Sequence, residues 1–254
     1  MENRVIDLVR TLRYVRSKWT QANLLTRHSP TAAHVPATLP FSAANMKRLL
    51  SRYSTLYVKP DAGGQGIGVI RVDRRKGRGY LVRTAGKRMV SKDSKALFRV
   101  LRKSTKHRRY VIQQGIPSVT LKGNPFAIRV HIQRVQGKWV IGGVAGTVAP
   151  PRKIVTNRHR GGTPMEMNVL LKRHLGYNKN QRSNMKQQLE KLSREAARAM
   201  AKGYPRIREY GIDFGLNSNG KLWIYEVNIT PGIAIFASLP NKGQYYRILR
   251  LRKR

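Results

Sequence analysis

Two apolar segments, Tyr210-Gly-Ile-Asp-Phe-Gly-Leu216 and Lys221-Leu-Trp-Ile-Tyr-Glu-Val-Asn228, are separated by a polar stretch that ends in Asn219-Gly220. Asn-Gly is a preferred two-residue hairpin turn, so we expect the two segments to pair as antiparallel strands. Each segment carries one carboxylate among its apolar residues. The hairpin therefore brings two acidic residues onto neighbouring strands.

The turn also predicts the register of this hairpin. A two-residue turn places Asp213 directly opposite Glu226, and the other expected pairs are Ser218 with Lys221, Leu216 with Trp223, and Phe214 with Tyr225. Like charges that face each other destabilise a sheet, which indicates a cation between them. Asn228 lies two residues beyond Glu226 and adds a carbonyl oxygen on the same face. These hard oxygen ligands suit Mg2+ or Mn2+ held together with phosphates, whereas the alternative is two solvent-facing acids on an ordinary hairpin.

The composition restricts the classes of partner. The 254 residues include 52 Lys and Arg but only 11 Asp and Glu, a formal charge of +41. This charge predicts attraction to nucleic acid, an acidic polymer, an anionic membrane or a multiply charged substrate. The chain has no cysteine, which excludes disulfides and thiol chemistry and fits a reducing, cytoplasmic location. The longest apolar stretch, residues 139–149, is too short for a transmembrane segment, and arginines interrupt the apolar residues of the N-terminus, which argues against a signal peptide.

A glycine-rich segment, Asp61-Ala-Gly-Gly-Gln-Gly-Ile-Gly68, lies between strands expected at residues 56–60 and 69–72. Such glycines let backbone amides approach a polyphosphate, because no Cβ stands in the way. The segment lacks the Gly-Lys-Ser/Thr ending of a Walker motif, so we expect it to cover phosphates from above. Lys59 is then placed to reach an α or β phosphate. A plain glycine hairpin is the alternative interpretation.

Periodicity predicts the remaining elements. An amphipathic helix is expected over residues 1–20, a linker over 28–40, and a helix capped by Ser42. Further strands are expected at 110–116, 126–133 and 138–149, then a basic loop at 156–162 and a long helix at 183–200. In 126–133 the even-numbered residues are apolar, whereas Arg129, His131 and Gln133 point to the other face. His131 and His159 fit polar contacts better than catalysis, because neither belongs to a metal-spaced cluster or a nucleophile elbow.

The order of these motifs resembles the ATP-grasp superfamily and, more narrowly, the YheC/YheD-type proteins associated with bacterial endospore coats. The resemblance runs from about Lys18 to about Gly232. The motifs that carry it are Val58-Lys-Pro60, Gly63-Gly-Gln-Gly-Ile-Gly68, Phe126-Ala-Ile-Arg129, Thr156-Asn-Arg-His-Arg-Gly-Gly162, Gly211-Ile-Asp-Phe-Gly215 and Glu226-Val-Asn-Ile-Thr-Pro-Gly232. The last of these is the most specific.

The resemblance implies an α+β fold in which ATP lies between two α+β lobes. The small lobe would comprise residues 41–117 and the large lobe 118–240. An N-terminal helix and linker at 1–40 would precede them, and a basic, weakly ordered tail at 241–254 would follow. The implied chemistry activates a carboxylate as an acyl phosphate, which an amine then attacks.

The resemblance also implies roles for individual residues. Asp213, Glu226 and Asn228 would bind Mg2+ or Mn2+, and Arg129 and Arg160 would steady the phosphoryl group or the acyl phosphate. The implied ATP-binding residues are Lys18, Lys59, Gly63, Gly64, Gln65, Gly66, the adenine hinge Gln114, Gly115 and Ile116, and Asn157. Two positions depart from the pattern of many relatives: Ala127 stands where an acid is common, and Val155 where an arginine is common. These departures imply weaker ATP binding or slower turnover.

The main functional hypothesis is an ATP- and Mg2+-dependent carboxylate–amine ligase acting on an acidic carboxylate or peptide substrate, with a spore-coat context implied only by resemblance. The alternative is a protein that keeps the nucleotide-binding fold but serves as a basic structural or binding protein for nucleic acid or an anionic spore polymer. A kinase is the third class, and the absence of a catalytic-loop aspartate with its His-Arg partners argues against it.

Overall fold

The computed structural model describes residues 16–75, 77, 79–105 and 108–254. Residues 1–15 of the expected N-terminal helix therefore lie outside the described residues. The chain divides into two compact units. Unit 1 contains the described residues up to Thr20, Pro36–Ile116 and Lys153–Val155, and unit 2 contains Gln21–Val35, Pro117–Arg152 and Thr156–Arg254. Within the described ranges, no helix has the length and apolar character needed to cross a bilayer.

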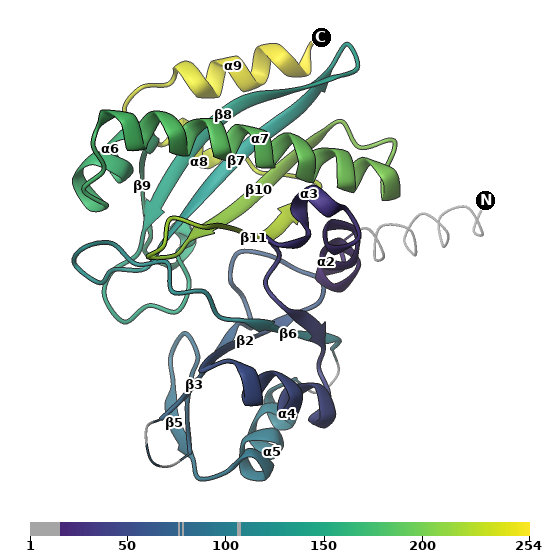
Figure 1. Cartoon of the computed structure of the whole chain (residues 1–254), viewed down its shortest axis with the longest axis vertical. Helices are drawn as coiled ribbons and strands as arrows, with labels where there is room; N and C mark the ends of the chain where they lie inside the picture. The colour runs from purple at the N-terminus through teal and green to yellow at the C-terminus, as the bar shows by residue number, and fades with distance from the viewer. Residues whose placement is uncertain (1–15, 76, 78, 106–107) are drawn as a thin grey trace. The chain divides into compact units, whose positions relative to one another are not determined.

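Unit 1 is built on a six-stranded antiparallel sheet of order β1-β6-β2-β3-β4-β5. Helices α4 and α5 cover one face of this sheet (Figure 1). The strands are β1 Thr38–Pro40, β2 Thr55–Pro60, β3 Ile70–Arg74, β4 Tyr80–Arg83, β5 Arg88–Ser91 and β6 Tyr110–Gln114, and the helices are α4 Ala43–Arg52 and α5 Ser94–Thr105. Alternation along β2 buries Leu56 and Val58 in the core beneath these helices and leaves Thr55, Tyr57 and Lys59 on the opposite, polar face.

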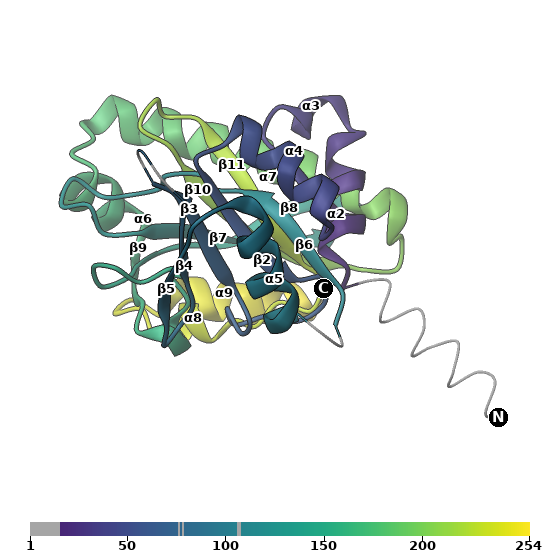
Figure 2. The same ribbon diagram turned by 90° about the horizontal axis from the view of Figure 1, so that it is seen from below.

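Unit 2 is built on a five-stranded antiparallel sheet of order β11-β10-β7-β8-β9. The long helix α7 lies on one face, and α8 and α9 lie on the other (Figures 1 and 2). The strands are β7 Phe126–Val135, β8 Lys138–Val148, β9 Thr163–Glu166, β10 Glu209–Leu216 and β11 Leu222–Asn228. The helices are α3 Ser29–Ala32, α6 Met167–Val169 continued by a π-helical turn Leu170–His174, α7 Lys179–Gly203, α8 Ala234–Ala237 and α9 Gly243–Arg252, and a 3-10 turn spans Arg158–Arg160.

The helix ends follow the expected capping chemistry. The Ser42 hydroxyl accepts a hydrogen bond from the Asn45 backbone amide at the start of α4, as predicted. Helix α7 begins earlier than predicted, because Asn178 and Gln181 form a reciprocal capping box at its first turn. The predicted strands at 126–133 and 138–149 correspond to β7 and β8.

The β10–β11 hairpin keeps one predicted pair and changes the others. Its loop has three residues, Ser218 to Gly220, because Asn217 pairs with Lys221 and Gly220 adopts a left-handed φ of 73°. The predicted pairs nearest the turn are therefore wrong by one residue: Leu216 faces Leu222. An irregularity at Asp213/Phe214 restores the register, so Asp213 lies opposite Glu226 as predicted.

Two stretches are more ordered than the sequence indicated. The expected linker at 28–40 contains α3 and the edge strand β1, whose backbone pairs with β6. The expected weakly ordered tail forms α9, which packs against β8. The Ile248 side chain is fully buried there, and Arg252 binds Glu209 through two hydrogen bonds of 2.9 and 2.8 Å. Burial of an apolar side chain and a two-point ion pair stabilise the docked helix more than hydration stabilises a free, charged segment.

Candidate functional site

The glycine-rich loop of unit 1 joins the antiparallel strands β2 and β3, as predicted. Gly63 has a φ of 121°, which side chains rarely adopt, and the position of its missing Cβ meets no atom within 4 Å. Gln65, Gly66 and Gly68 also have positive φ values. The loop therefore has a fixed, glycine-dependent path with open space around Gly63 and Gly64.

Lys18 is held next to this loop by the start of α2, Lys18–Thr26. The Asp61 carboxylate accepts hydrogen bonds of 3.0 Å from the Ser17 hydroxyl and from the Trp19 backbone amide. An anion at a helix N-terminus is favourable because free amides and the helix dipole both point toward it. The Lys18 ammonium donates to the Gly63 carbonyl oxygen at 3.0 Å. Two residues predicted to bind ATP, Lys18 and Gly63, are thus brought together.

Lys59 lies on the polar face of the unit 1 sheet. Its ammonium donates to the Gln113 side-chain oxygen at 2.6 Å and lies 5.5 Å from the centre of the Tyr57 ring. The Gln113 amide in turn donates to the Thr38 hydroxyl. Lys59 is therefore oriented by strands β1, β2 and β6 together.

The predicted adenine hinge follows directly at the end of β6. The backbone amide of Gln114 donates to the Ala37 carbonyl oxygen, and the Gln114 side-chain oxygen accepts from the Ala37 backbone amide. Gly115 donates to the Thr55 carbonyl, and a Cβ on Gly115 would lie 2.4 Å from the Thr55 Cγ2 atom. These contacts give Gln114 and Gly115 a structural role in fixing the segment that leads to Ile116.

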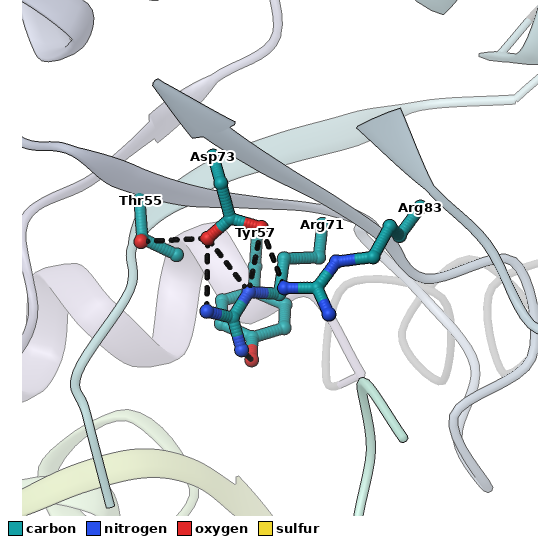
Figure 3. Close-up of polar contacts among 5 residues, drawn as sticks. All are labelled: Thr55, Tyr57, Arg71, Asp73 and Arg83. Atoms are coloured by element: carbon teal, nitrogen blue, oxygen red, sulfur yellow. Dashed lines mark hydrogen bonds and ion pairs between the residues drawn. The ribbon is translucent and has the colours of Figure 1, made fainter. Parts of the chain in front are cut away.

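A polar cluster that the sequence analysis missed lies on the same sheet face (Figure 3). The Asp73 carboxylate accepts from the Thr55 hydroxyl at 2.9 Å, and it forms ion pairs with Arg71 at 2.8 Å and Arg83 at 2.7 Å. Arg71 also packs against the Tyr57 ring. The alternation Thr55-x-Tyr57 and Arg71-x-Asp73 on paired strands was the signal that could have revealed it.

The environment of this cluster shifts the pKa values of Asp73 and Tyr57. Burial alone would raise the pKa of Asp73, but the hydrogen bonds and charges of Arg71 and Arg83 dominate and lower it. Burial raises the pKa of Tyr57 even though Arg71 opposes that shift. Asp73 is therefore an ionised carboxylate whose charge is matched by two guanidinium groups.

In unit 2, Arg129, Asp213 and Glu226 form a row across three adjacent strands. Arg129 on β7 faces Asp213 on β10, which faces Glu226 on β11. The Arg129 guanidinium binds Asp213 at both ends, with Nε–Oδ1 at 2.6 Å and Nη2–Oδ2 at 2.9 Å. Burial disfavours the charge on Arg129, but Asp213 and Glu226 outweigh it and raise the pKa of the guanidinium. The row holds two acids and one base.

Asn228 completes this row. Its side-chain amide donates to Asp213 Oδ2 at 3.1 Å and to the Gly211 carbonyl at 3.3 Å. Two carboxylates and an amide oxygen form a donor set of the kind Mg2+ prefers. Asp213 Oδ1 accepts one hydrogen bond, from Arg129, and keeps a second lone pair. No three His, Asp or Glu residues gather into a metal-binding group in the described part of the chain. The residues present fit a divalent ion held by two carboxylates and an amide together with phosphate oxygens.

Asn157 and Arg160 lie on the basic loop after β8. The Asn157 carbonyl accepts from the amides of Arg160 and Gly162, which folds the loop into its 3-10 turn. Gly162 has no space for a side chain, because a Cβ would lie 2.6 Å from Thr147 Cγ2. Within the ranges that the structure covers, neither the Asn157 nor the Arg160 side chain makes a hydrogen bond or ion pair. The structure thus does not join these two residues to the Asp213 row.

His131 is fully buried and serves a structural contact, in line with the sequence interpretation. Its Nε2 atom lies 3.2 Å from Glu209, which also binds Arg252 of α9. Together the His131 and Arg252 interactions lower the pKa of Glu209, although burial opposes the shift. Ala127 is half-buried on β7 and faces Thr147 of β8, so no acid occupies that position.

Comparison with solved structures defines the fold class as ATP-grasp. D-cycloserine synthetase DcsG superposes with a TM-score of 0.60 at 14% identity, covering 96% of this chain and 72% of that one. The L-amino acid ligase from Bacillus licheniformis gives a TM-score of 0.53 at 17% identity, covering 88% of this chain and 42% of that one. The predicted ATP-grasp fold is confirmed.

The family follows from the sequence matches. Residues 11–252 match the family model described as YheC/D like ATP-grasp. The endospore coat-associated protein YheD of Bacillus subtilis (strain 168) is 30% identical over 236 residues, which cover 89% of this chain and 50% of that protein. The chain belongs to the YheC/D-like ATP-grasp family, and it spans about half the length of this relative. The resemblance identified in the sequence is confirmed.

Proposed function

We propose that this protein is an ATP- and Mg2+-dependent ligase that joins a carboxylate to an amine. The observation that carries this proposal is the row in which Asp213 lies directly opposite Glu226, with Asn228 bonded to Asp213. Carboxylates opposite each other destabilise a sheet unless a cation compensates them. Arg129 supplies one such cation by binding Asp213, and we propose that a bound divalent ion supplies another.

The proposed reaction has two steps. An oxygen of the substrate carboxylate attacks the γ-phosphorus of ATP and releases ADP, which gives an acyl phosphate. The amine nitrogen then attacks the acyl carbon, phosphate leaves, and the amine loses a proton. Such chemistry depends mainly on positioning and electrostatics, which suits a chain whose candidate residues are fixed cations and carboxylates rather than a nucleophile.

The residues of each unit have distinct proposed tasks. Lys18, Lys59 and the loop Gly63–Gly66 would bind ATP phosphates, and Gln114, Gly115 and Ile116 would contact adenine. Asp213, Glu226 and Asn228 would hold Mg2+, which supplies charge neutralisation for the phosphates when bound. The Nη1 group of Arg129 makes no hydrogen bond among the described residues, so it is available to an oxygen of the acyl phosphate. Asn157 and Arg160 would reach the nucleotide and phosphoryl group from their loop.

The charge of the chain supports an acidic substrate. A formal charge of +41 attracts anions and raises their local concentration at the surface. We propose an acidic carboxylate or peptide as the substrate, and the similarity to YheD suggests a task connected with the spore coat.

Calorimetry of ATP binding at physiological salt, with and without Mg2+, tests this function. Native protein should bind ATP more tightly with Mg2+, and the variant Asp213→Asn/Glu226→Gln should lose that dependence. The matched control, Glu166→Gln/Glu190→Gln, removes two carboxylates of unit 2 outside the row and should bind as the native chain does. ADP release on adding acidic carboxylates and amines then identifies the substrates. Weak ATP binding that ignores both Mg2+ and the Asp213 row would sink the proposal.

A further inference from the structure

Helices α4 and α5 of unit 1 carry a cationic surface that the proposed ligase reaction does not use. We define this α4/α5 surface by its seven exposed basic residues: Lys47, Arg48, Arg52, Lys95, Arg99, Arg102 and Lys103. The buried residues of the same helices, among them Leu49 and Leu97, pack into the unit 1 core beside the sheet. The cations therefore point away from the sheet, on the face opposite to Lys59. Neither helix contains an acidic residue.

The acidic residues in the described part of unit 1 are used elsewhere. Residues 36–116 include only three, Asp61, Asp73 and Asp93. Asp61 binds the start of α2, and Asp73 binds Arg71 and Arg83. Asp93 caps α5 by accepting from the Ala96 amide at 2.7 Å. Across the ranges that the structure describes, none of the seven cations forms a salt bridge, so their charge is available to a partner.

The chemistry of the α4/α5 surface selects among anionic partners. The large apolar side chains that are exposed in the described residues, such as Ile67, Leu121 and Tyr246, all lie outside α4 and α5. Insertion into a lipid surface needs exposed apolar residues, and recognition of an acidic peptide usually needs an aromatic or aliphatic anchor. Single-stranded nucleic acid needs exposed aromatic rings for base stacking, whereas Phe98 of α5 is stacked on Phe41 at 5.4 Å.

We propose that the α4/α5 surface binds the phosphate backbone of double-stranded DNA without sequence preference. A uniformly cationic surface that lacks apolar anchors matches a ligand whose charges repeat regularly and whose bases are stacked out of reach. Figure 2 shows α4 and α5 on the same side of the unit 1 sheet, so both helices present their cations to one partner. This binding is independent of the proposed ligase reaction.

Fluorescence anisotropy with labelled duplexes of unrelated sequence tests the proposal over a range of salt concentrations. The first variant removes four charges from the surface: Lys47→Ala, Arg48→Ala, Lys95→Ala and Arg102→Ala. Alanine favours helices, so both helices should persist. We expect the Kd at physiological salt to rise at least about tenfold and the salt slope to fall by about 3 to 4, since each phosphate contact contributes about 0.9.

Two controls distinguish a specific effect of the α4/α5 surface on DNA binding from an effect of lower total charge and from unfolding. The first removes four exposed cations of unit 2: Lys179→Ala, Lys191→Ala, Lys202→Ala and Arg206→Ala. It should change Kd less than about threefold and leave the salt slope unchanged. The second keeps the charge: Arg48→Lys, Arg52→Lys, Arg99→Lys and Arg102→Lys, and it should bind duplex DNA as the native chain does. Each variant is compared with the native chain by its thermal unfolding midpoint.

Four results would overturn the inference. The first two are an equal loss of duplex affinity in the α4/α5 and unit 2 alanine variants, and no loss of affinity in either. The third is competition by single-stranded DNA or polyglutamate that is as strong as competition by unlabelled duplex. The fourth is complete displacement of the duplex by Mg-ATP. The last result would place DNA at the nucleotide site. Duplex binding that survives saturating Mg-ATP supports the inference, whether or not ligase activity is found.

Discussion

The polar face of unit 1 and the Asp213 row of unit 2 each place two like charges opposite each other, but the charges have opposite signs. In unit 1, Arg71 and Arg83 lie directly opposite each other, and Asp73 binds both of them. In unit 2, Asp213 and Glu226 lie directly opposite each other, and one arginine, Arg129, binds Asp213. In the first cluster one carboxylate lies between two guanidinium groups, whereas in the second one guanidinium group lies beside two carboxylates.

This difference matters because the chain has nearly five basic residues for every acidic one. In such a chain a carboxylate readily finds enough cations, as Asp73 does with two arginines and Glu209 does with His131 and Arg252. Two carboxylates that lie directly opposite each other, as Asp213 and Glu226 do, are therefore unusual here. We interpret Asp73 and Glu209 as structural carboxylates, and we propose that the facing pair Asp213 and Glu226 holds an external cation.

Removal of Asp73 should give the largest loss of stability. Asp73→Ala leaves the half-buried guanidinium groups of Arg71 and Arg83 facing each other without a counter-charge. Breaking a buried ion pair costs about 3–5 kcal/mol, and partial exposure of these side chains reduces the expected loss to about 2–3 kcal/mol. Urea unfolding followed by circular dichroism measures it. Asp73→Asn still offers an acceptor to Thr55 and should therefore lose less stability. A loss below about 1 kcal/mol for Asp73→Ala, which is typical of an exposed ion pair, would contradict the structural role.

The contribution of Asp73 should also depend on pH. The arginines lower the pKa of this carboxyl in the folded state, although burial opposes them. A lowered pKa gives stability that is fully present above the unfolded value of about 3.9 and is lost as the pH falls through the folded value. The difference in free energy of unfolding between the native chain and Asp73→Asn should be constant from about pH 5 to 7 and shrink below about pH 4. A difference that grows on acidification would contradict this linkage.

The smallest stability effect is expected at the Asp213 row. Asp213→Asn removes one of two facing acids, so it relieves repulsion while Arg129 keeps the nearby charge of Glu226. The asparagine also keeps one acceptor oxygen for the partly buried Arg129, so we expect the free energy of unfolding at pH 7 to fall by about 1 kcal/mol, less than for Asp73→Ala. The same urea assay measures it beside Asp73→Ala. Equal losses for Asp213→Asn and Asp73→Ala would remove the distinction between the two clusters.

Local patterns in the sequence predicted much of the fold around the site. Alternation in residues 126–133 gave β7, the Ser42 cap gave the start of α4, and the two apolar segments gave the β10–β11 hairpin. The pair Asp213–Glu226 was predicted from a turn of the wrong length. The three-residue turn shifts the register by one residue, and the irregularity beside Asp213 shifts it back. The sequence contains no simple signal for that second shift.

Other elements depend on partners far away in the chain. The C-terminal segment looked like a solvated tail because its charge is high, but Ile248 and Arg252 find partners on β7, β8 and β10. Edge strand β1 is only three residues long and forms because β6 pairs with it. Short or highly charged segments carry little periodicity of their own, so their structure follows from tertiary contacts.

The sequence by itself determined the high positive charge of the chain, the absence of thiol chemistry, the order of motifs that marks the family, and the identity of the two facing acids. Only the tertiary structure decided which cations lie beside each carboxylate. Asp73 forms an ion pair with Arg83 of β4, and Asp213 forms one with Arg129 of β7. The residues of each pair come from different strands, and the composition of the intervening segments does not reveal the pairing. Charge compensation acts over a few ångströms in space, and spacing along the chain does not fix that distance.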